Sequence, residues 1–459
     1  METRATCISS CLCTPAGSRS AALVFLRHLS LANFRNYRQL ELELPGPIVL
    51  LQGDNGQGKS NLLEAVYFLA TTRPLRATSD RELIHWAAME EPIPFARVAG
   101  TVRRESSELR VEVVIRADRL ERRGSLLAEG EATPGALSKR IKVNGVVKRA
   151  LELIGLINVV TFSPQDLELI AGAPALRRRF LDIADCQVDP RYCRALQQYN
   201  RVLLQRNHLL KEIRDGRQPA ETLDFWNDEL VESGAYLLAR RLSTVWSLNG
   251  RIHSYHKRLT GTGRHLRVVY RSSVEEAAAR DRVELGGTPP QPLDLASQPP
   301  ALEKEVERQA ELFREALRRS RRRESHQGVS LVGPHRDDIH FLADGIDMNI
   351  YGSRGEQRAV ALALKMSEVE FMQESTGERP ILLLDDVMSE LDPIRRRMLA
   401  ETIGGAGQTL ITATELDPFS PAFLRQAAIF RIERGNATRV QPYGPDRQPR
   451  SGESPSGEL

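Results

Sequence analysis

The spacing of apolar residues divides the chain into strand-like and helix-like stretches. Between Phe25 and Leu44, apolar and polar residues alternate, which predicts two strands around a turn at residues 33–36. Ile48–Gln52 is a continuous apolar run that suits a buried strand, and Asn61–Ala70 has the pattern of an apolar helix. Further strands are predicted at residues 96–102, 109–115, 329–331, 339–342, 381–384, 409–412 and 429–432, and Asn144-Gly145 predicts a hairpin turn.

The middle of the chain has a different pattern. From Ala175 to about Gly263, apolar residues recur at helical spacing, and a further helix is predicted at residues 301–324. The fold class predicted is therefore α/β, with the α/β domain split in sequence by an all-helical insert. The expected segments are a disordered extension at 1–23, a first α/β part at 24–165, a helical arm at 166–325 with a Pro-rich loop at 286–300, a second α/β part at 326–440 and a disordered tail at 441–459.

Composition narrows the class of protein. The 459 residues carry 64 Lys and Arg against 60 Asp and Glu, and this net charge of +4 is too small for a uniformly basic nucleic-acid binder. Local basic patches remain compatible with that balance. No apolar run reaches the length of about 18 residues that a membrane span needs, and the five cysteines lack zinc-site or disulfide spacing. We expect a cytoplasmic protein with reduced thiols that does not bind membranes.

A phosphate-binding loop is predicted between the apolar run and the apolar helix. The segment fits the pattern G-x-x-x-x-G-K-[ST] and consists of Gly53, Asp54, Asn55, Gly56, Gln57, Gly58, Lys59 and Ser60. Its glycines let backbone N–H groups point at phosphate oxygens, and the start of the helix adds positive potential. Lys59 is expected to reach the β- and γ-phosphates of ATP, and Ser60 is expected to bind Mg²⁺.

A second part of the nucleotide site is predicted where the apolar strand at residues 381–384 ends in two acids, Asp385 and Asp386. A buried parallel strand brings carboxylates to its carboxyl end, where such sites lie. Asp385 is expected to hold the Mg²⁺ shell, and Asp386 is expected to orient the attacking water. Lys59, Asp385 and Asp386 are therefore the candidate catalytic residues.

Two short segments flank this strand. Ser353, Gly355 and Gln357 precede a predicted helix, and Ser389, Glu390 and Asp392 follow the two acids. Their order resembles the signature, Walker B and D-loop elements of the ABC-type ATPases. A Ser hydroxyl and a Gly N–H at a helix start form an anion site. In those ATPases the signature of one subunit covers the γ-phosphate held by another, so the resemblance implies an ATP-dependent homodimer.

The chain as a whole resembles the RecF family, bacterial recombination mediators related to the SMC proteins. The matching segments lie at residues 29–37, 53–60, 142–145, 162–182, 199–211, 333–338, 353–358 and 382–392. This resemblance implies an ABC-type P-loop ATPase head split by a helical arm with a short coiled coil. It also implies weak DNA-dependent ATP hydrolysis, binding of double-stranded DNA and of single-strand/double-strand junctions, and cooperation with RecR and RecO in loading RecA during repair and replication restart.

Some positions depart from the family pattern or stay open. The segment after the first helix diverges, which leaves the roles of Arg73 and Arg76 open, and Thr414 is a candidate sensor of the γ-phosphate. The densest basic clusters are Arg177–Arg179 and, on a predicted helix, Arg318, Arg319, Arg321, Arg322 and Arg323. Either cluster suits salt-sensitive contacts to DNA phosphates or a solvated, salt-bridged helix face.

Other functions are compatible with part of these motifs. An ABC-class ATPase that does not act on DNA would share the phosphate loop and the signature. A DNA scaffold that binds ATP without hydrolysing it would share every motif. This alternative stays open because Asp386 stands in place of a Glu, which is compatible with slow hydrolysis. A small-molecule kinase would share only the phosphate loop and would have no use for the signature.

Overall fold

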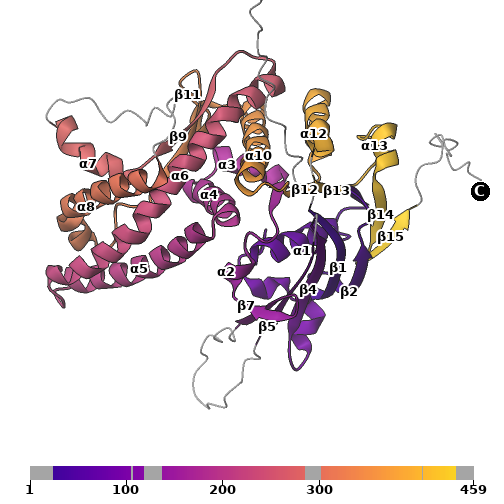
Figure 1. Cartoon of the computed structure of the whole chain (residues 1–459), viewed down its shortest axis with the longest axis horizontal. Coiled ribbons are helices and arrows are strands. Elements are labelled where there is room, and N and C mark those ends of the chain that lie inside the picture. Colours follow the sequence, from indigo (N-terminus) through magenta and orange to yellow (C-terminus); the bar gives the residue numbers. More distant parts are fainter. Residues whose placement is uncertain (1–23, 105–106, 118–136, 285–300, 406, 441–459) are drawn as a thin grey trace, which may run out of the picture.

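The computed structural model describes residues 24–104, 107–117, 137–284, 301–405 and 407–440. The predictions for residues 1–23, 286–300 and 441–459 lie outside the described residues. Figure 1 shows an α/β part with the sheets on one side and long helices extending from it on the other. Among the described residues, no helix combines the length and the apolar character that crossing a membrane requires.

One sheet is antiparallel and contains the hairpins predicted from the sequence. Its strands lie in the order β2-β1-β4-β5-β6-β7. The bounds are β1 Phe25–Phe34, β2 Tyr37–Glu43, β4 Phe95–Arg103, β5 Glu108–Ala117, β6 Leu137–Val143 and β7 Val146–Lys148. Asn144 and Gly145 connect β6 and β7 with φ angles of 51° and 82°, as a two-residue hairpin turn requires, so this prediction is confirmed.

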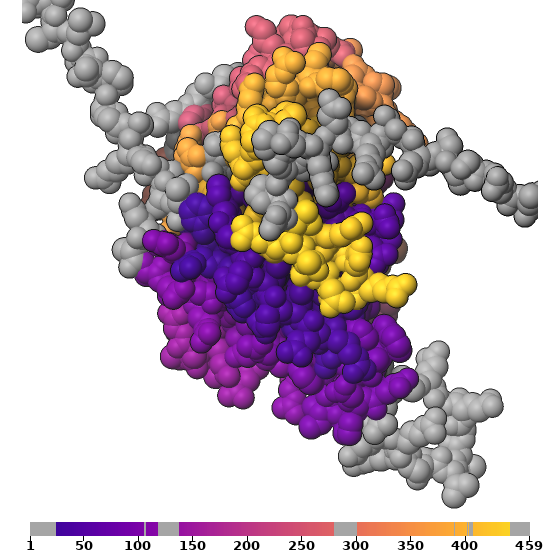
Figure 2. Space-filling view, turned by 90° about the vertical axis from the view of Figure 1, so that its right-hand side faces the viewer, coloured from indigo at the N-terminus to yellow at the C-terminus, as the bar shows by residue number. Residues whose placement is uncertain are grey.

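The second sheet is mainly parallel and has the strand order β15-β14-β3-β13-β12-β8. Only the edge strand β15 is antiparallel to its neighbour. The bounds are β3 Ile48–Gln52, β8 Val159–Phe162, β12 Ile381–Asp385, β13 Gln408–Ala413, β14 Ala428–Glu433 and β15 Asn436–Val440. The C-terminal strands, yellow in Figure 2, lie beside the indigo N-terminal segments on the face shown, because β14 pairs with β3.

The parallel sheet separates two apolar cores, which explains the continuous apolar runs of its strands. In β3, Ile48 and Leu50 belong to one core, whereas Val49 and Leu51 belong to the other. The core on the side of Val49 and Leu51 also contains the antiparallel sheet and helix α1, Lys59–Thr71. Since successive strand residues face opposite sides, both faces need apolar side chains.

The other core extends without interruption into the helical arm. Helix α6 packs against α5 and α8 in the arm and against α10 in the head. The main helices here are α4 Pro174–Val188, α5 Pro190–Arg214, α6 Leu223–Thr260, α7 Ser273–Glu284, α8 Leu302–Gln327 and α10 Arg354–Thr376. The helical pattern predicted from Ala175 to about Gly263 is thus confirmed as α4, α5 and α6.

The prediction that the arm at residues 166–325 is all-helical is wrong. It contains β9 Leu266–Arg271, which pairs with β10 Asp338–Ala343, and β11 Ile346–Asp347 completes a three-stranded sheet. Leu266, Val268 and Tyr270 are buried. A strand forms here because these alternate residues reach the arm core while the backbone pairs with β10.

The strand predicted at residues 329–331 is also wrong, because side chains rather than a neighbouring strand bind this backbone. The Ser330 N–H donates to Asn207 Oδ1 at 2.8 Å, and the Leu331 N–H donates to Glu324 Oε1 at 2.8 Å. The short helices are α2 Ala150–Leu153, α3 Leu167–Ala171, α9 Met348–Tyr351, α11 Val387–Glu390, α12 Pro393–Gly405 and α13 Pro421–Gln426, and the 3-10 helices are η1 Asp80–Leu83, η2 Trp86–Glu90, η3 Pro164–Asp166 and η4 Ala220–Thr222.

Candidate nucleotide site

The phosphate loop connects the carboxyl end of β3 to the start of α1. Gly58 ends the loop with a φ angle of 111°, and a Cβ atom there would lie 2.4 Å from Asn36 Nδ2. The side chains of Asn36 and Tyr37 hold the loop in place, because they donate hydrogen bonds to the carbonyls of Gln57 and Gly58 at 3.0 Å each. Only glycine therefore fits position 58, for both conformational and steric reasons.

Lys59 folds back over this loop. Its Nζ donates to the carbonyl of Gly53 at 2.6 Å and to that of Asp54 at 3.0 Å. Lys59 is 6% exposed. Burial lowers its pKa, and the nearby carboxylates of Asp386 and Asp54 partly oppose that change. The ammonium group is held where an incoming phosphate can replace the carbonyls as its partner.

Asp385 lies opposite the loop at the end of β12. Its Oδ1 accepts hydrogen bonds from Ser60 Oγ at 2.7 Å and from Thr412 Oγ1 at 2.8 Å. Thr412 is the register partner of Asp385 on β13. Its hydroxyl also accepts from the Asp386 N–H at 2.9 Å. A hydroxyl and a carboxylate oxygen this close together are the hard oxygen ligands that Mg²⁺ prefers, so these residues fit a bound Mg²⁺ ion.

Arg76, whose role the sequence left open, contacts the same carboxylate. Its guanidinium forms an ion pair with Asp385 Oδ2. The backbone of the loop that carries Arg76 is fixed by Glu64, whose Oε1 accepts from the N–H groups of Leu75 and Arg76 at 3.2 and 3.1 Å. Arg76 therefore neutralises the acid that a metal ion would otherwise neutralise.

These groups surround a cavity of about 220 Å³. Its walls include residues of the phosphate loop together with Arg76, Asp385, Asp386 and Thr412. The structure thus brings the two predicted halves of the nucleotide site together. The sequence analysis missed Thr412, and it named Thr414 as a candidate sensor of the γ-phosphate. The strand register, which places residue 412 opposite residue 385, is the signal that identifies Thr412 as a residue of the cavity, whereas the role of Thr414 stays a prediction.

The signature residues lie outside this cavity. Ser353 caps α10 by accepting from the Glu356 N–H at 3.3 Å, and both Ser353 and Gly355 are exposed. Gln357 is buried instead, and its Nε2 donates to the carbonyl of Met348 at 3.0 Å. The amide of Gln357 therefore holds the turn before α10, whereas Ser353 and Gly355 face solvent.

The D-loop contacts both of these regions. Ser389 Oγ lies 2.8 Å from the Asp386 carbonyl and 3.0 Å from its Oδ1. Asp392 accepts from the N–H groups of Ile394 and Arg395 at the start of α12, and Arg395 donates to the carbonyl of Gly355 at 3.1 Å. The side chain of Glu390 lies outside the described residues. The D-loop thus links Asp386 to the signature within one chain.

The predicted basic clusters differ in exposure. Arg177 is buried and forms an ion pair of 2.7 Å with Asp338, so it is not available to DNA. On α8, Arg318 and Arg319 pair with Glu315 at 2.7 and 2.5 Å. Arg321 pairs with Asp224 at 3.1 Å. Arg322 and Arg323 are exposed.

Comparisons with known proteins identify the family. A family model described as the RecF/RecN/SMC N terminal domain matches residues 25–436. A "DNA replication and repair protein RecF" of Chloroflexus aggregans is 40% identical over 419 residues, which cover 90% of this chain and 99% of that protein. The protein of the same description from Bacillus subtilis is 34% identical over 414 residues, with coverages of 90% and 99%.

Solved structures agree with these relatives. A structure described as "the recombination mediator protein RecF-ATPrS in RecFOR pathway" is similar with a TM-score of 0.74 and 30% identity, and the match covers 92% of this chain and 100% of that one. A second structure, described as RecF-ATP in the same pathway, has a TM-score of 0.71 and 29% identity, with coverages of 91% and 100%. The fold, the phosphate loop and these relatives lead to one conclusion: the chain belongs to the RecF family.

Proposed function

We propose that this protein is an ATP-gated homodimeric clamp on double-stranded DNA and on single-strand/double-strand junctions. In this proposal it acts in the cytoplasm with RecR and RecO and helps to load RecA at gaps during repair and replication restart. Its RecF relatives, one of them described as RecF-ATP and as part of the RecFOR pathway, support this proposal.

The proposal of a dimeric clamp rests mainly on the position of the signature residues. The signature residues Ser353 and Gly355 are exposed and lie outside the cavity formed by the phosphate loop, Asp385 and Asp386. Among the described residues, those that line the cavity include residues of the phosphate loop, Arg76, Asp385, Asp386 and Thr412, and the signature residues are not among them. A second copy would supply its own Ser353 hydroxyl and Gly355 N–H at the start of α10, where the helix dipole favours an anion. Each ATP would then be bound by two chains.

Hydrolysis in this proposal uses groups that already lie around the cavity. Lys59 moves from its carbonyl partners to the β- and γ-phosphates and neutralises their charge. Asp386 orients the attacking water, and Ser389 holds the Asp386 carboxylate in position. Ser60 and Asp385 would hold Mg²⁺, which supplies charge neutralisation of the phosphates when it is bound. The reaction is ATP and water to ADP and phosphate, and we expect it to be slow and stimulated by DNA.

The oligomeric state tests this proposal. Light scattering with and without ATP and DNA is expected to show ATP-dependent dimers for the wild type. Lys59→Met removes the phosphate contact, and Ser353→Arg places a bulky cation in the opposite half-site, so both are expected to leave monomers. Ser254→Arg, an exposed substitution on α6, is the matched control and is expected to dimerise. Wild-type protein that stays monomeric with ATP and DNA would contradict the clamp.

A further inference from the structure

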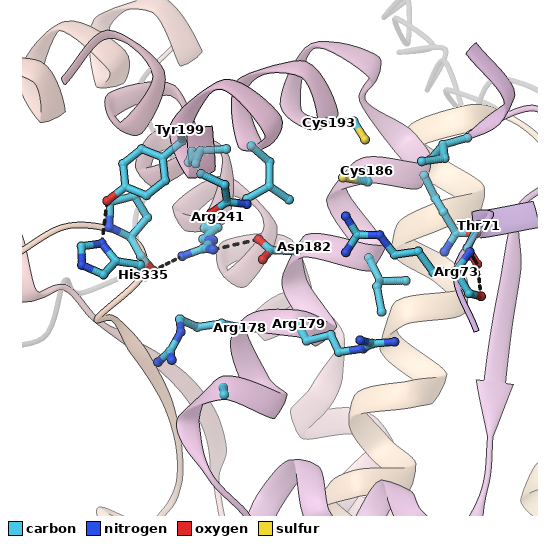
Figure 3. Close-up of a pocket in the computed structure, with 18 residues that line it drawn as sticks. Thr71, Arg73, Arg178, Arg179, Asp182, Cys186, Cys193, Tyr199, Arg241 and His335 are labelled. Carbon is cyan, nitrogen blue, oxygen red and sulfur yellow. Dashed lines mark hydrogen bonds and ion pairs between the residues drawn. The ribbon is translucent and has the colours of Figure 1, made fainter. Parts of the chain in front are cut away.

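A second cavity lies away from the nucleotide site, between the head and the arm (Figure 3). Its volume is about 380 Å³, within the range of about 300–1,000 Å³ that is usual for small-molecule sites. Its walls come from the end of α1, from α4, α5 and α6, and from the loop before β10. Part of the wall is apolar and includes Ile154, Ile183, Leu196 and Leu237.

Three arginines, Arg73, Arg178 and Arg179, line the same cavity. Arg178 donates to the carbonyl of Asp337 at 2.8 Å, and Arg179 donates to the carbonyl of Pro74 at 3.2 Å. Throughout the part of the chain that the structure describes, none of the three has a carboxylate within ion-pair distance. Each guanidinium carries five N–H groups, so most of these donors are available to a ligand.

The acids near these arginines already have other partners. Asp182 accepts from Arg241 and from Tyr192 at 2.7 and 2.6 Å. Asp337 accepts from the hydroxyls of Tyr270 and Ser273, and Asp338 pairs with Arg177. Burial, together with the charge of Arg241, lowers the pKa of Arg178, and the carboxylates of Asp338, Asp337 and Asp182 partly oppose that change. Arg178 is partly buried, whereas Arg73 and Arg179 are exposed. The cavity therefore holds an excess of positive charge that extends to its solvent-exposed side, where an anion would be stabilised.

We propose that this cavity binds a phosphate ester, with Arg73 and Arg179 beside the phosphate and the apolar wall against the attached organic group. Arg178 extends from α4 in the opposite direction from Arg179 (Figure 3). Guanidinium groups match the oxygens of a phosphate through paired hydrogen bonds, so two arginines can bind one phosphate together. The source of the phosphate is either a free nucleotide or a nucleic-acid strand. The experiment below distinguishes these two sources.

The loop that carries Arg73 connects this cavity to the nucleotide site. Arg179 binds the Pro74 carbonyl, and two residues later Arg76 pairs with Asp385. A phosphate that attracts Arg73 and Arg179 acts on the segment that positions Arg76. The bound ester is then an effector of the Mg²⁺ site. This coupling rests on the proposed function, whereas the binding itself does not.

Two cysteines in the cavity wall, Cys186 and Cys193, provide a direct measure of occupancy. The test uses the full chain with Cys7, Cys11 and Cys13 replaced by Ser and with Lys59→Met to suppress binding at the phosphate loop. The alkylation rate of Cys186 and Cys193 by iodoacetamide is followed by mass spectrometry, with AMP or with a short 5′-phosphorylated duplex. Slower alkylation with AMP identifies a free nucleotide as the source, and slower alkylation with the duplex alone identifies a nucleic-acid phosphate.

Arginine substitutions make the test specific. Arg73→Ala and Arg179→Ala change exposed side chains, and each is expected to raise the half-protecting concentration about tenfold, the loss of roughly one charge-assisted hydrogen bond. Arg201→Ala, an exposed change on α5 outside the cavity, is expected to have no effect. Unchanged alkylation with both probes, or an equal effect of Arg201→Ala, overturns the binding proposal.

A further measurement tests the coupling separately. In the chain with Lys59 intact, the protecting ligand is expected to change the Mg²⁺ concentration at half-saturation of ATP binding, and Arg73→Ala is expected to abolish that change. Protection of the cysteines without any change in the Mg²⁺ requirement would retain the binding site and overturn its role as an effector site.

Discussion

Arginines in the arm and in the nucleotide site contact acids in two different ways. In the arm, Arg206 donates to Asn227, Ser330 and Glu324 at 2.9, 2.6 and 2.6 Å. Arg206 is 1% exposed and Glu324 is 0% exposed. In the nucleotide site, Arg76 is partly exposed and contacts one oxygen of Asp385, the acid expected to bind Mg²⁺.

The two ion pairs differ in whether another cation can take the place of the arginine beside the acid. All three nitrogens of the Arg206 guanidinium have protein partners from α6, α8 and the loop after α8, and water cannot reach the pair with Glu324. Such an ion pair fixes the packing of the arm. In the Arg76 pair the arginine side chain is 39% exposed, and the buried Asp385 carboxylate lines the cavity, so a metal ion that enters the cavity can compete for it. The same residue type is therefore expected to act as structure in the arm and as an exchangeable counter-ion in the head.

The largest expected effect comes from breaking the buried pair. Arg206→Ala leaves the Glu324 carboxylate buried without its cation and is expected to reduce the free energy of unfolding by about 3–5 kcal/mol. Denaturant unfolding followed by circular dichroism measures this change. Arg201→Ala, on the exposed side of the same helix, is the control and is expected to stay within about 0.5 kcal/mol of wild type. If Arg206→Ala reduced the free energy of unfolding by no more than the control does, the distinction between the two kinds of arginine would not hold.

The second effect depends on pH and involves a buried acid of the arm. Asp185 is 0% exposed and accepts from Thr244 Oγ1 at 2.5 Å, while its Oδ2 has no hydrogen-bond partner among the described residues. Burial raises its pKa to about 7 from 3.8. Because the folded state holds this proton more tightly than the unfolded state, the stability that protonation contributes is present below about pH 4 and is lost as the pH rises through about 7.

Asp185→Asn removes this dependence. Relative to wild type, the variant is expected to gain stability by up to about 1.4 kcal/mol per pH unit between about pH 4 and about pH 7, and to gain no more above that range. Unfolding by denaturant across that pH series measures the gain. A stability difference that does not change with pH would show that Asp185 is ionised in the fold.

A third, smaller effect is expected at the exchangeable pair. Arg76→Ala frees the Asp385 carboxylate and is expected to lower the Mg²⁺ concentration at half-saturation of ATP binding about fivefold, the equivalent of roughly 1 kcal/mol for a partly exposed ion pair. Titration of Mg²⁺ with a fluorescent ATP analogue measures this. An unchanged or higher Mg²⁺ requirement would mean that Arg76 does not compete with the metal.

The smallest effect is expected from arginines that are exposed on α8. Binding of duplex DNA in the presence of ATP is expected to fall steeply with salt. Arg322→Ala and Arg323→Ala are each expected to reduce the slope of log affinity against log salt by about 0.9 if that side chain contacts one phosphate, with little change in stability. Slopes equal to that of wild type would remove these residues from the DNA surface.

Local patterns predicted the elements that form the nucleotide site. The strand predicted at Ile48–Gln52 has the same bounds in the structure, and the run at residues 381–384 became β12 with one further residue, Asp385. Both strands are buried on two faces, so a continuous apolar run is sufficient to identify them. The glycine pattern identified the phosphate loop for an equally local reason, because it reflects the backbone conformation of that loop.

The remaining features depend on contacts between distant parts of the chain. Strand β8, at Val159–Phe162, exists because it pairs with β12, which lies more than 200 residues later. Arg206 and Glu324 are 118 residues apart, and nothing near Arg206 in the sequence separates it from exposed arginines such as Arg201. Thr412 was missed because its place beside Asp385 follows from the register between β12 and β13. The apolar pattern of each strand by itself does not specify that register.

The hydrogen bond between Ser60 and Asp385 spans 325 residues of sequence. A ribosome that adds about 5–20 residues per second needs about 16–65 seconds to make that stretch. Throughout this interval the nascent chain has a phosphate loop but no Asp385, and the apolar strand β3 lacks both of its neighbours, β13 and β14. The two expected metal ligands therefore come together only late in synthesis, after most of the chain has left the ribosome.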